Sequence, residues 1–356
     1  MANKCQFWKE YDSVSGPVSY CELAAFNRSV NPDFLLKIGC TESKRKECLG
    51  SMELNIEVGA TPASKPATTP VASFSPPAEI AKSMITVAEN KCAINMKSLI
   101  PLAILAGAYI ALGAIMFTII TNDLAAFVGD GLTRMVGGIS FSLGLILVII
   151  GGAELFTGNC MVMTGYLEKK VTGKQLLSNW FWVYLFNFVG SLLVVFLFYY
   201  SGIWKANGGA IGARAVNVAA AKASLPWVEA LFRGIFCNWL VCLAVWLSNA
   251  SRDIIGKILA IMIPIAAFVA AGFEHSIANM YFIPMGLVLA NQEALLGLLD
   301  PAIIQGLTMK GFFLNNLIPV TIGNIIGGAG FVATTYWGAY LRPLHSQKGI
   351  AVNRKM

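Results

Sequence analysis

Six long apolar segments, joined by short polar connections, make up most of the chain after residue 97. They lie at about 98–121, 136–166, 176–201, 228–249, 256–291 and 312–341. Each approaches or exceeds the ~20 residues that an α-helix needs to cross a bilayer. The pattern predicts an all-α polytopic membrane protein with six transmembrane helices.

Polar residues interrupt the second and fifth segments, which are too long for simple spans. The interruptions read AELFTGN (153–159) and GFEHSIAN (272–279), and each sets a carboxylate and an asparagine beside glycine. Irregular backbone at membrane depth is tolerated only where protein or a water-filled cavity surrounds it. Two broken helices at corresponding positions of two three-span halves predict an inverted repeat with a transport pathway at its interface.

The chain divides further by composition. We expect a polar appendage of unknown role at 1–57, a Pro-, Ala- and Thr-rich linker at 58–77, an amphipathic surface helix at 78–96, the six-helix domain at 97–342 and a basic cytoplasmic tail at 343–356. The appendage lacks the basic start and apolar core of a secretory signal. Its cysteines Cys5, Cys21, Cys40 and Cys48 show no CxxC spacing, so free cytosolic thiols are expected in preference to a metal site.

Composition supports the membrane assignment and removes one class of partner. Hydrophobic residues make up 56% of the chain and charged residues 13%, whereas soluble proteins are about 25% charged. Mean hydropathy is +0.65. Basic residues in cytoplasmic loops account for the formal net charge of +7, so nucleic acid is not an expected partner.

Basic residues also orient the spans. One set of connections, with the C-terminal tail, holds Lys169, Lys170, Lys174, Arg252, Lys257, Arg342, Lys348, Arg354 and Lys355, and the other holds Arg134, Lys205, Arg214, Lys222 and Lys310. The side richer in Lys and Arg is normally cytoplasmic. We therefore expect a multi-pass protein of the plasma or inner membrane with both termini in the cytoplasm.

Two other function classes lack their motifs. The chain contains no HExxH, no GxSxG elbow and no GxxxxGK[ST] loop, so an enzyme is not expected. The paired NPA boxes of water channels are also absent, which disfavours a neutral-solute pore. His275 is the sole histidine within the spans. An ionisable residue at membrane depth favours a transport pathway over a purely structural role.

Four stretches carry a family resemblance. VGGISFSLGLIL (136–147), AELFTGN (153–159), GFEHSIANMYFIPMG (272–286) and NLIPVTIGNIIGG (316–328) resemble the signatures of the formate/nitrite transporter family, and the closest likeness is to bacterial formate channels. The resemblance implies a homopentamer in which each protomer has six helices and its own pore. It also implies an aquaporin-like inverted repeat that conducts small monovalent anions without a cofactor.

The resemblance further implies which residues form the pore. His275 matches the central pore histidine, with Thr157 and Asn324 beside it. The other matched positions are the apolar constriction residues Phe141, Leu145, Leu155 and Phe268, the fourth-span residues Asn238 and Val241, and Lys222 near the outer vestibule.

Four polar residues at the two breaks have a structural interpretation: Glu154, Asn159, Glu274 and Asn279. A carboxylate near the start of a half-helix complements the positive end of that helix. Direct contact with the transported anion is disfavoured, because a negative charge would repel it.

The residues also suggest how an anion crosses. Hydrogen-bond donors at the breaks can replace part of the hydration that an anion loses in a narrow apolar passage. Histidine can in addition exchange a proton with the anion of a weak acid. Formate is the preferred substrate, and nitrite and hydrosulfide stay open as alternatives. Channel-like flux and proton-coupled transport also both stay open.

Overall fold

The computed structural model describes residues 8–13, 16–21, 74–295 and 297–342. The chain splits into two compact units, Met1–Val71 and Ala72–Met356. In the first unit, β1 (Trp8–Ser13) pairs antiparallel with β2 (Gly16–Cys21). Most of the predicted appendage and linker (1–57 and 58–77) and the predicted tail (343–356) lie outside the described residues.

Helices make up most of the described part of the second unit. Its elements are α4 (Pro77–Ala93), α5 (Met96–Ile120), α6 (Ala125–Phe141), α7 (Leu143–Gly151), α8 (Phe156–Asn159), η1 (Cys160–Val162), α9 (Met163–Leu167), α10 (Gly173–Ser201), η2 (Ile203–Lys205), η3 (Asn207–Gly209), α11 (Ala210–Ala223), α12 (Trp227–Ala250), α13 (Ile254–Ala271), α14 (Ser276–Leu289), η4 (Glu293–Leu295), α15 (Pro301–Ile304), η5 (Gly311–Leu317), α16 (Ile318–Ile325), η6 (Ile326–Thr334) and η7 (Trp337–Leu341). The last four elements are parts of a single long helix, Gly311–Leu341, with π-helical turns.

Six helices in the described part of the chain are long and apolar enough to cross a membrane, which confirms the predicted number of spans. The second span differs most from its predicted bounds. It was predicted at 136–166, whereas the helix runs over Ala125–Gly151 and starts well before residue 136. Asp130 and Arg134 lower the hydropathy of this early part, and Gly129 kinks it with φ +76°. The apolar pattern therefore becomes visible only after the charged turn.

The two predicted helix breaks share one backbone path. Gly152 ends α7 with φ +78° and Gly272 ends α13 with φ +76°. Glycine adopts this left-handed conformation without the steric cost that a Cβ atom imposes. Leu155 then precedes α8 with φ −107° and ψ 127°, and His275 precedes α14 with φ −108° and ψ 115°. The inverted repeat thus extends to individual backbone angles.

Close helix packing repeats between the halves as well. α5 packs along α10, and α12 packs along α16. A Cβ atom at Gly190 would overlap the carbonyl oxygen of Ile104, and one at Gly327 would overlap that of Ile235. Small residues allow such close approach between membrane helices. These contacts fix the distance between the helices that flank each break.

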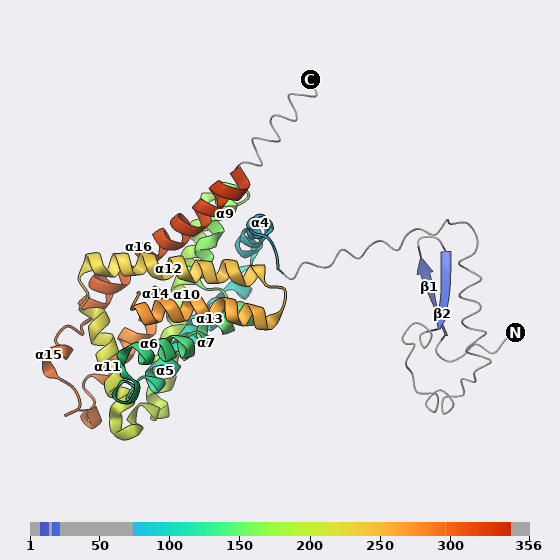
Figure 1. Ribbon diagram of the computed structural model, residues 1–356. Coiled ribbons are helices and arrows are strands. Elements are labelled where there is room, and N and C mark those ends of the chain that lie inside the picture. The colour runs from blue at the N-terminus through green and yellow to red at the C-terminus, as the bar shows by residue number, and fades with distance from the viewer. Residues whose placement is uncertain (1–7, 14–15, 22–73, 296, 343–356) are drawn as a thin grey trace, which may run out of the picture. The chain divides into compact units, whose positions relative to one another are not determined.

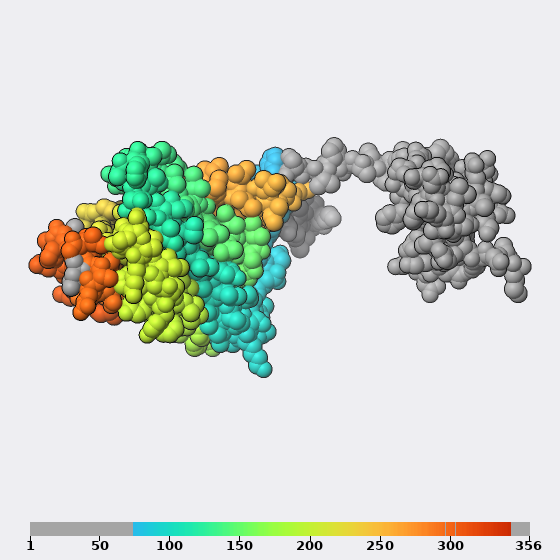
Figure 2. Space-filling view, turned by 90° about the horizontal axis from the view of Figure 1, so that it is seen from below, coloured from blue at the N-terminus to red at the C-terminus, as the bar shows by residue number. Residues whose placement is uncertain are grey.

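The ends of the helical unit are distinct. In Figure 1, α4 and α9 lie toward one end of the bundle, and α11 and α15 lie at the other. The connection between α14 and the last span, orange in Figure 2, packs against α11. α4, which covers most of the predicted surface helix at 78–96, buries Ile80 and Met84 against protein, where it contacts α9, η1 and η7. Its apolar side is therefore already covered within the described chain.

Candidate functional site

His275 lies at the second break, with both ring nitrogens engaged. Its Nδ1 accepts a hydrogen bond from the backbone N–H of Ala278 at 3.1 Å. Its Nε2 lies 2.8 Å from the hydroxyl oxygen of Thr157, which belongs to the first break. Because Nδ1 accepts, a neutral ring carries its proton on Nε2, and this N–H donates to Thr157. The arrangement therefore fits a neutral histidine that offers one N–H donor.

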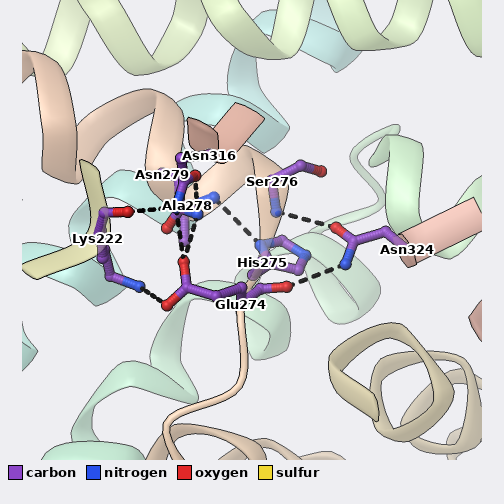
Figure 3. A network of polar contacts seen from close by, with 8 residues as sticks. All are labelled: Lys222, Glu274, His275, Ser276, Ala278, Asn279, Asn316 and Asn324. Atoms are coloured by element: carbon purple, nitrogen blue, oxygen red, sulfur yellow. Dashed lines mark hydrogen bonds and ion pairs between the residues drawn. The ribbon is translucent and has the colours of Figure 1, made fainter. Parts of the chain in front are cut away.

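Asn324 holds the backbone of this break in place (Figure 3). Its side-chain oxygen accepts from the N–H of Ser276 at 2.9 Å. Its amide nitrogen donates to the carbonyls of Glu274 at 3.0 Å and Gly234 at 2.8 Å. Both N–H groups are thus used within the protein. The structure thus gives Asn324, which the resemblance placed beside His275, contacts that position the backbone of the break.

Asn238 also differs from its implied place along the pore. Its amide nitrogen donates to the carbonyl of Asn324 and, at 3.2 Å, to that of Thr157. It is fully buried and does not belong to the lining of the cavities described below. An amide that satisfies two backbone carbonyls between helices is used for packing. The side chain therefore joins the first break to α16 of the last span.

The first break has the same support from Asn187. The N–H of Phe156 donates to the Asn187 side-chain oxygen at 2.9 Å. The Asn187 amide donates in turn to the carbonyls of Glu154 at 2.9 Å and Ala103 at 2.8 Å. Asn187 is therefore the counterpart of Asn324 in the other half of the chain.

A buried ion pair stands beside the second break (Figure 3). Lys222 Nζ lies 2.9 Å from Glu274 Oε1. The amide of Asn279 donates to Glu274 Oε2 at 2.7 Å and to the Asn316 oxygen at 2.6 Å. Asn316 donates to the carbonyl of Lys222 at 2.9 Å, which closes the network. Without these partners the buried carboxylate would pay a large desolvation cost.

The first break repeats this network with different residues. Lys91 Nζ lies 2.7 Å from Glu154 Oε1. Asn159 donates to Glu154 Oε2 at 2.8 Å and to the Asn179 oxygen at 2.9 Å. Asn179 donates to the carbonyl of Lys91 at 3.2 Å. Both carboxylates are thus neutralised by a lysine from a neighbouring helix, in addition to their place near a helix start.

The sequence alone did not single out Lys91, Asn179, Asn187 or Asn316. A signal was present in the sequence. Asn179 and Asn187 of the third span are eight residues apart, and so are Asn316 and Asn324 of the sixth span. Asparagine is costly in a membrane span unless it is hydrogen-bonded. A matched pair in two corresponding spans therefore pointed to matched partners.

Two cavities approach the breaks from opposite ends. The larger of the two, of about 580 Å³, lies beside α11 and reaches Lys222, Glu274 and His275, and it is named the outer cavity. The smaller, of about 260 Å³, reaches Lys91, Glu154, Asn159, Leu145 and Leu155, and it is named the inner cavity. A small void of about 10 Å³ lies between them and is lined by Ile110, Phe141, Leu145, Val241, Ile265, Phe268 and His275. Such a void holds about one water molecule. Three of the four predicted constriction residues, Phe141, Leu145 and Phe268, therefore surround this void together with His275. The fourth, Leu155, lines the inner cavity instead.

Aromatic rings form most of the outer side of this constriction. Phe141 and Phe268 meet edge to face with ring centroids 5.8 Å apart, and Phe268 lies 6.1 Å from the ring of His275. Phe282 stacks on Phe141 at 6.3 Å and meets Phe117 at 5.8 Å. Phe117 and Phe282 were not expected from the sequence, and they extend the apolar ring into the outer cavity.

Within the described residues, no group of three or more His, Cys, Asp or Glu side chains is placed to hold a metal ion. Cys5, Cys40 and Cys48 lie outside the described residues, and of Cys21 only its place in β2 is described. The prediction for these four cysteines therefore stays a prediction.

The family model for formate/nitrite transporters matches residues 78–338, which include both breaks and the networks beside them. The chain belongs to the formate/nitrite transporter family. It is therefore a multi-pass membrane protein of a family of transporters and channels, and the resemblance inferred from the four sequence stretches is confirmed.

Several relatives are similar over most of their length. A probable formate transporter of Methanothermobacter thermautotrophicus is 46% identical over 285 residues, which cover 76% of this chain and 98% of the relative. The formate channel FocA of Escherichia coli K12 is 43% identical over 245 residues, 68% of this chain and 86% of FocA. A solved pentameric formate channel with formate bound is 36% identical, with a TM-score of 0.62 over 72% of this chain and 98% of that one. A solved ion channel of the same family is 30% identical, with a TM-score of 0.63.

Proposed function

We propose that this protein is a membrane channel for formate, that it assembles as a homopentamer, and that each protomer holds one pathway. The observation that carries the proposal is the pair of cavities that meet at an apolar constriction beside His275. Support comes from the relatives, which include formate channels and a pentamer with formate bound. Neither a cofactor nor a catalytic function is part of the proposal.

The geometry explains why a small anion is the favoured substrate. A bare anion loses most of its hydration in a passage of this width, and apolar rings return none of it. The N–H of His275 and the hydroxyl of Thr157 face each other across the two breaks at 2.8 Å. An anion that displaces this hydrogen bond can accept from both groups.

Charge compensation favours an anion as well. Glu154 and Glu274 would repel an anion if they stood alone, but each is paired with a lysine within 3 Å. Both pairs lie on cavity walls, where the lysine side chains stay 25% and 17% exposed. An approaching anion therefore meets a neutral pair whose cationic partner is the more accessible.

Proton exchange at His275 is part of the proposed mechanism. The resting ring is neutral, because Nδ1 accepts from Ala278. An anion beside the ring stabilises the imidazolium form and offsets the loss of that hydrogen bond. The ring takes the added proton from water that enters the outer cavity, which His275 lines. It then passes the proton to the carboxylate and returns to its neutral form, and the neutral acid crosses the apolar constriction.

The proposed orientation places both termini in the cytoplasm. Lys169, Lys170 and Lys174 follow α9. This helix packs against α4, whose Lys91 lines the inner cavity. Positive charge in short connections is retained on the cytoplasmic side of a cell membrane. The outer cavity then opens to the external face.

Uptake into liposomes tests the proposal. Purified protein is reconstituted, and the initial uptake of formate, nitrite, hydrosulfide and lactate is measured in parallel. Saturable formate uptake above that of protein-free liposomes is expected, with little uptake of lactate. Formate uptake equal to that of empty liposomes would refute the formate channel. Faster nitrite or hydrosulfide uptake would assign the protein to one of those anions instead.

A further inference from the structure

The outer cavity carries more positive charge than the ion pair at its floor requires. Among its described lining residues the cations are Arg134, Arg214, Lys222 and Arg233, and the carboxylate is Glu274. Lys222 is paired with Glu274 at 2.9 Å, and Arg233 is paired with the exposed Glu229 at 2.9 Å. Arg134 and Arg214 form no ion pair with any residue that the structure describes.

Arg214 is held rigidly in this cavity. Its Nε donates to the hydroxyl oxygen of Thr121 at 3.1 Å, and its guanidinium carbon lies 5.7 Å from the centre of the Phe117 ring. Its two terminal nitrogens make no hydrogen bond with the described residues. The hydrogen bond to Thr121 and the contact with the Phe117 ring together fix the plane of the guanidinium. The N–H groups of the two terminal nitrogens lie in that plane and can bind both oxygens of one carboxylate.

The surroundings of Arg214 leave its charge poorly compensated. Burial lowers the pKa of the Arg214 guanidinium, Arg134 acts in the same direction, and Asp130 acts against them. Arginine nevertheless stays protonated in proteins. Asp130 is not within ion-pair distance of it. An anion bound at the terminal nitrogens would replace part of the hydration that the guanidinium loses and would compensate its charge.

The position of Arg214 on α11 leads toward the constriction. Arg214, Val218, Ala221 and Lys222 line the same cavity, and their spacing of three or four residues places them on one side of the helix. The two cations are two turns apart, about 12 Å along the axis. Lys222 in turn lies 5.4 Å from the centre of the Phe282 ring, which is part of the aromatic constriction. An anion bound at Arg214 thus has a second cation between it and His275.

We propose that Arg214 is a docking site for planar two-oxygen anions, formate foremost, at the outer end of the pathway. The inference rests on the proposed anion channel and adds a loading step ahead of Lys222. The fork of the guanidinium selects for the paired oxygens, and its charge raises the local concentration of the anion.

Two variants separate charge from geometry. Arg214→Gln removes both, whereas Arg214→Lys keeps the charge and removes the fork. Lys310→Gln is the matched control, because Lys310 is exposed, precedes the last span on the outer side, and does not line the cavity. Each variant is reconstituted into liposomes with its outer cavity facing the external solution. Initial formate uptake is then measured against formate concentration at low and high ionic strength.

Arg214→Gln is expected to raise the half-saturating formate concentration about three- to tenfold and to flatten its dependence on ionic strength. Arg214→Lys should raise the half-saturating concentration while it keeps the wild-type ionic-strength dependence. Lys310→Gln should match the wild type in both measurements.

The outcomes distinguish this inference from the proposed function. A wild-type protein without formate uptake would remove the channel itself. A wild type that conducts, together with an Arg214→Gln variant that behaves like Lys310→Gln, would overturn the docking site alone. If Arg214→Gln does not assemble, Arg214→Lys decides, and an unchanged half-saturating concentration in that variant overturns the inference.

Discussion

The imidazole of His275 is fixed from both sides by groups of different origin. Ala278 lies in the helix that His275 caps, whereas Thr157 comes from the other break. An asparagine at the same position can still cap the helix, because asparagine is a favoured N-cap residue. Replacing His275 with asparagine is therefore compatible with a folded break. The role of the imidazole in transport can then be tested in a protein that still assembles.

His275→Asn is expected to preserve assembly and to alter the pH dependence of formate flux. The side chain keeps hydrogen-bonding capacity but cannot exchange a proton. Uptake measured between about pH 5 and pH 8, a range that brackets the ordinary histidine pKa near 6.5, should rise toward low pH in the wild type and stay flatter in the variant. His275→Phe removes the donor as well. The lost hydrogen bond, worth about 1–3 kcal/mol when buried, should lower flux roughly 5- to 160-fold.

A His275→Asn variant with the wild-type rate and the wild-type pH profile would contradict proton exchange. The histidine would then act as a hydrogen-bond donor or a structural residue.

Phe268→Ala should widen the constriction and relax its selectivity. The ring contacts both Phe141 and His275, so its loss opens the apolar ring at the narrowest region. The lactate-to-formate flux ratio in liposomes should increase several-fold. Phe331→Ala is a suitable control, because that ring stacks on Trp239 and lines none of the cavities that bound the pathway. An unchanged ratio in Phe268→Ala would place this ring outside the conduction path.

At the scale of elements, the two breaks share a backbone but differ in the residues that meet at the centre. Glu154 and Glu274 correspond, as do Asn159 and Asn279. In the same alignment of the two breaks, His275 occupies the position of Leu155, and Thr157 occupies the position of Ile277. Each half thus contributes one polar residue to the centre and one apolar residue in the equivalent place. The polar pair exists only because the two half-helices face each other.

The repeated networks predict matched effects on stability. Glu274→Gln and Glu154→Gln each leave a partly buried lysine without its carboxylate, at positions of equivalent geometry. We expect each change to lower the free energy of unfolding by about 1–3 kcal/mol, less than for a fully buried pair because the lysines reach the cavities. Thermal unfolding of the purified protein in detergent measures this effect.

Glu229→Gln provides the control for this pair of variants. Its ion pair with Arg233 is exposed, and exposed pairs contribute about 0–1 kcal/mol. Equal melting temperatures for Glu274→Gln, Glu154→Gln and Glu229→Gln would show that the buried networks do not stabilise the breaks.

For the whole molecule, the transport unit is expected to be independent of the first seventy residues. The matched family region begins at residue 78, and the compact unit begins at Ala72. Ser75 donates to the carbonyl of Ala250 at 2.8 Å, which attaches the start of this unit to the end of α12.

A chain that starts at Ala72 should therefore assemble and conduct formate at the wild-type rate. A chain that starts at Asn95 is the contrasting variant, because it loses α4 and with it Lys91, the partner of Glu154. It should be less stable or inactive. If the chain that starts at Ala72 assembles but shows an altered flux, residues 1–71 regulate the channel.

Apolar patterning determined the number of spans and the place of the two breaks. The hydrocarbon core requires about 20 apolar residues per helix, so six such segments and two polar interruptions are visible without coordinates. The motifs around residues 153–159 and 272–286 also determined the family. Span ends were less well determined. The charges at Asp130 and Arg134 concealed the first turns of the second span, since hydropathy averages over a window and does not register where a helix starts.

Only the tertiary structure decided which polar residues face one another. Lys91 and Glu154, like Lys222 and Glu274, come from separate helices, and no local pattern encodes a contact across that distance. The same holds for Asn324 and Asn238, which motif matching places along the pore but which the fold commits to backbone carbonyls. A buried amide must satisfy its hydrogen bonds with whatever lies beside it. The packing of the two halves supplies those neighbours, and so decides which groups remain free for an anion.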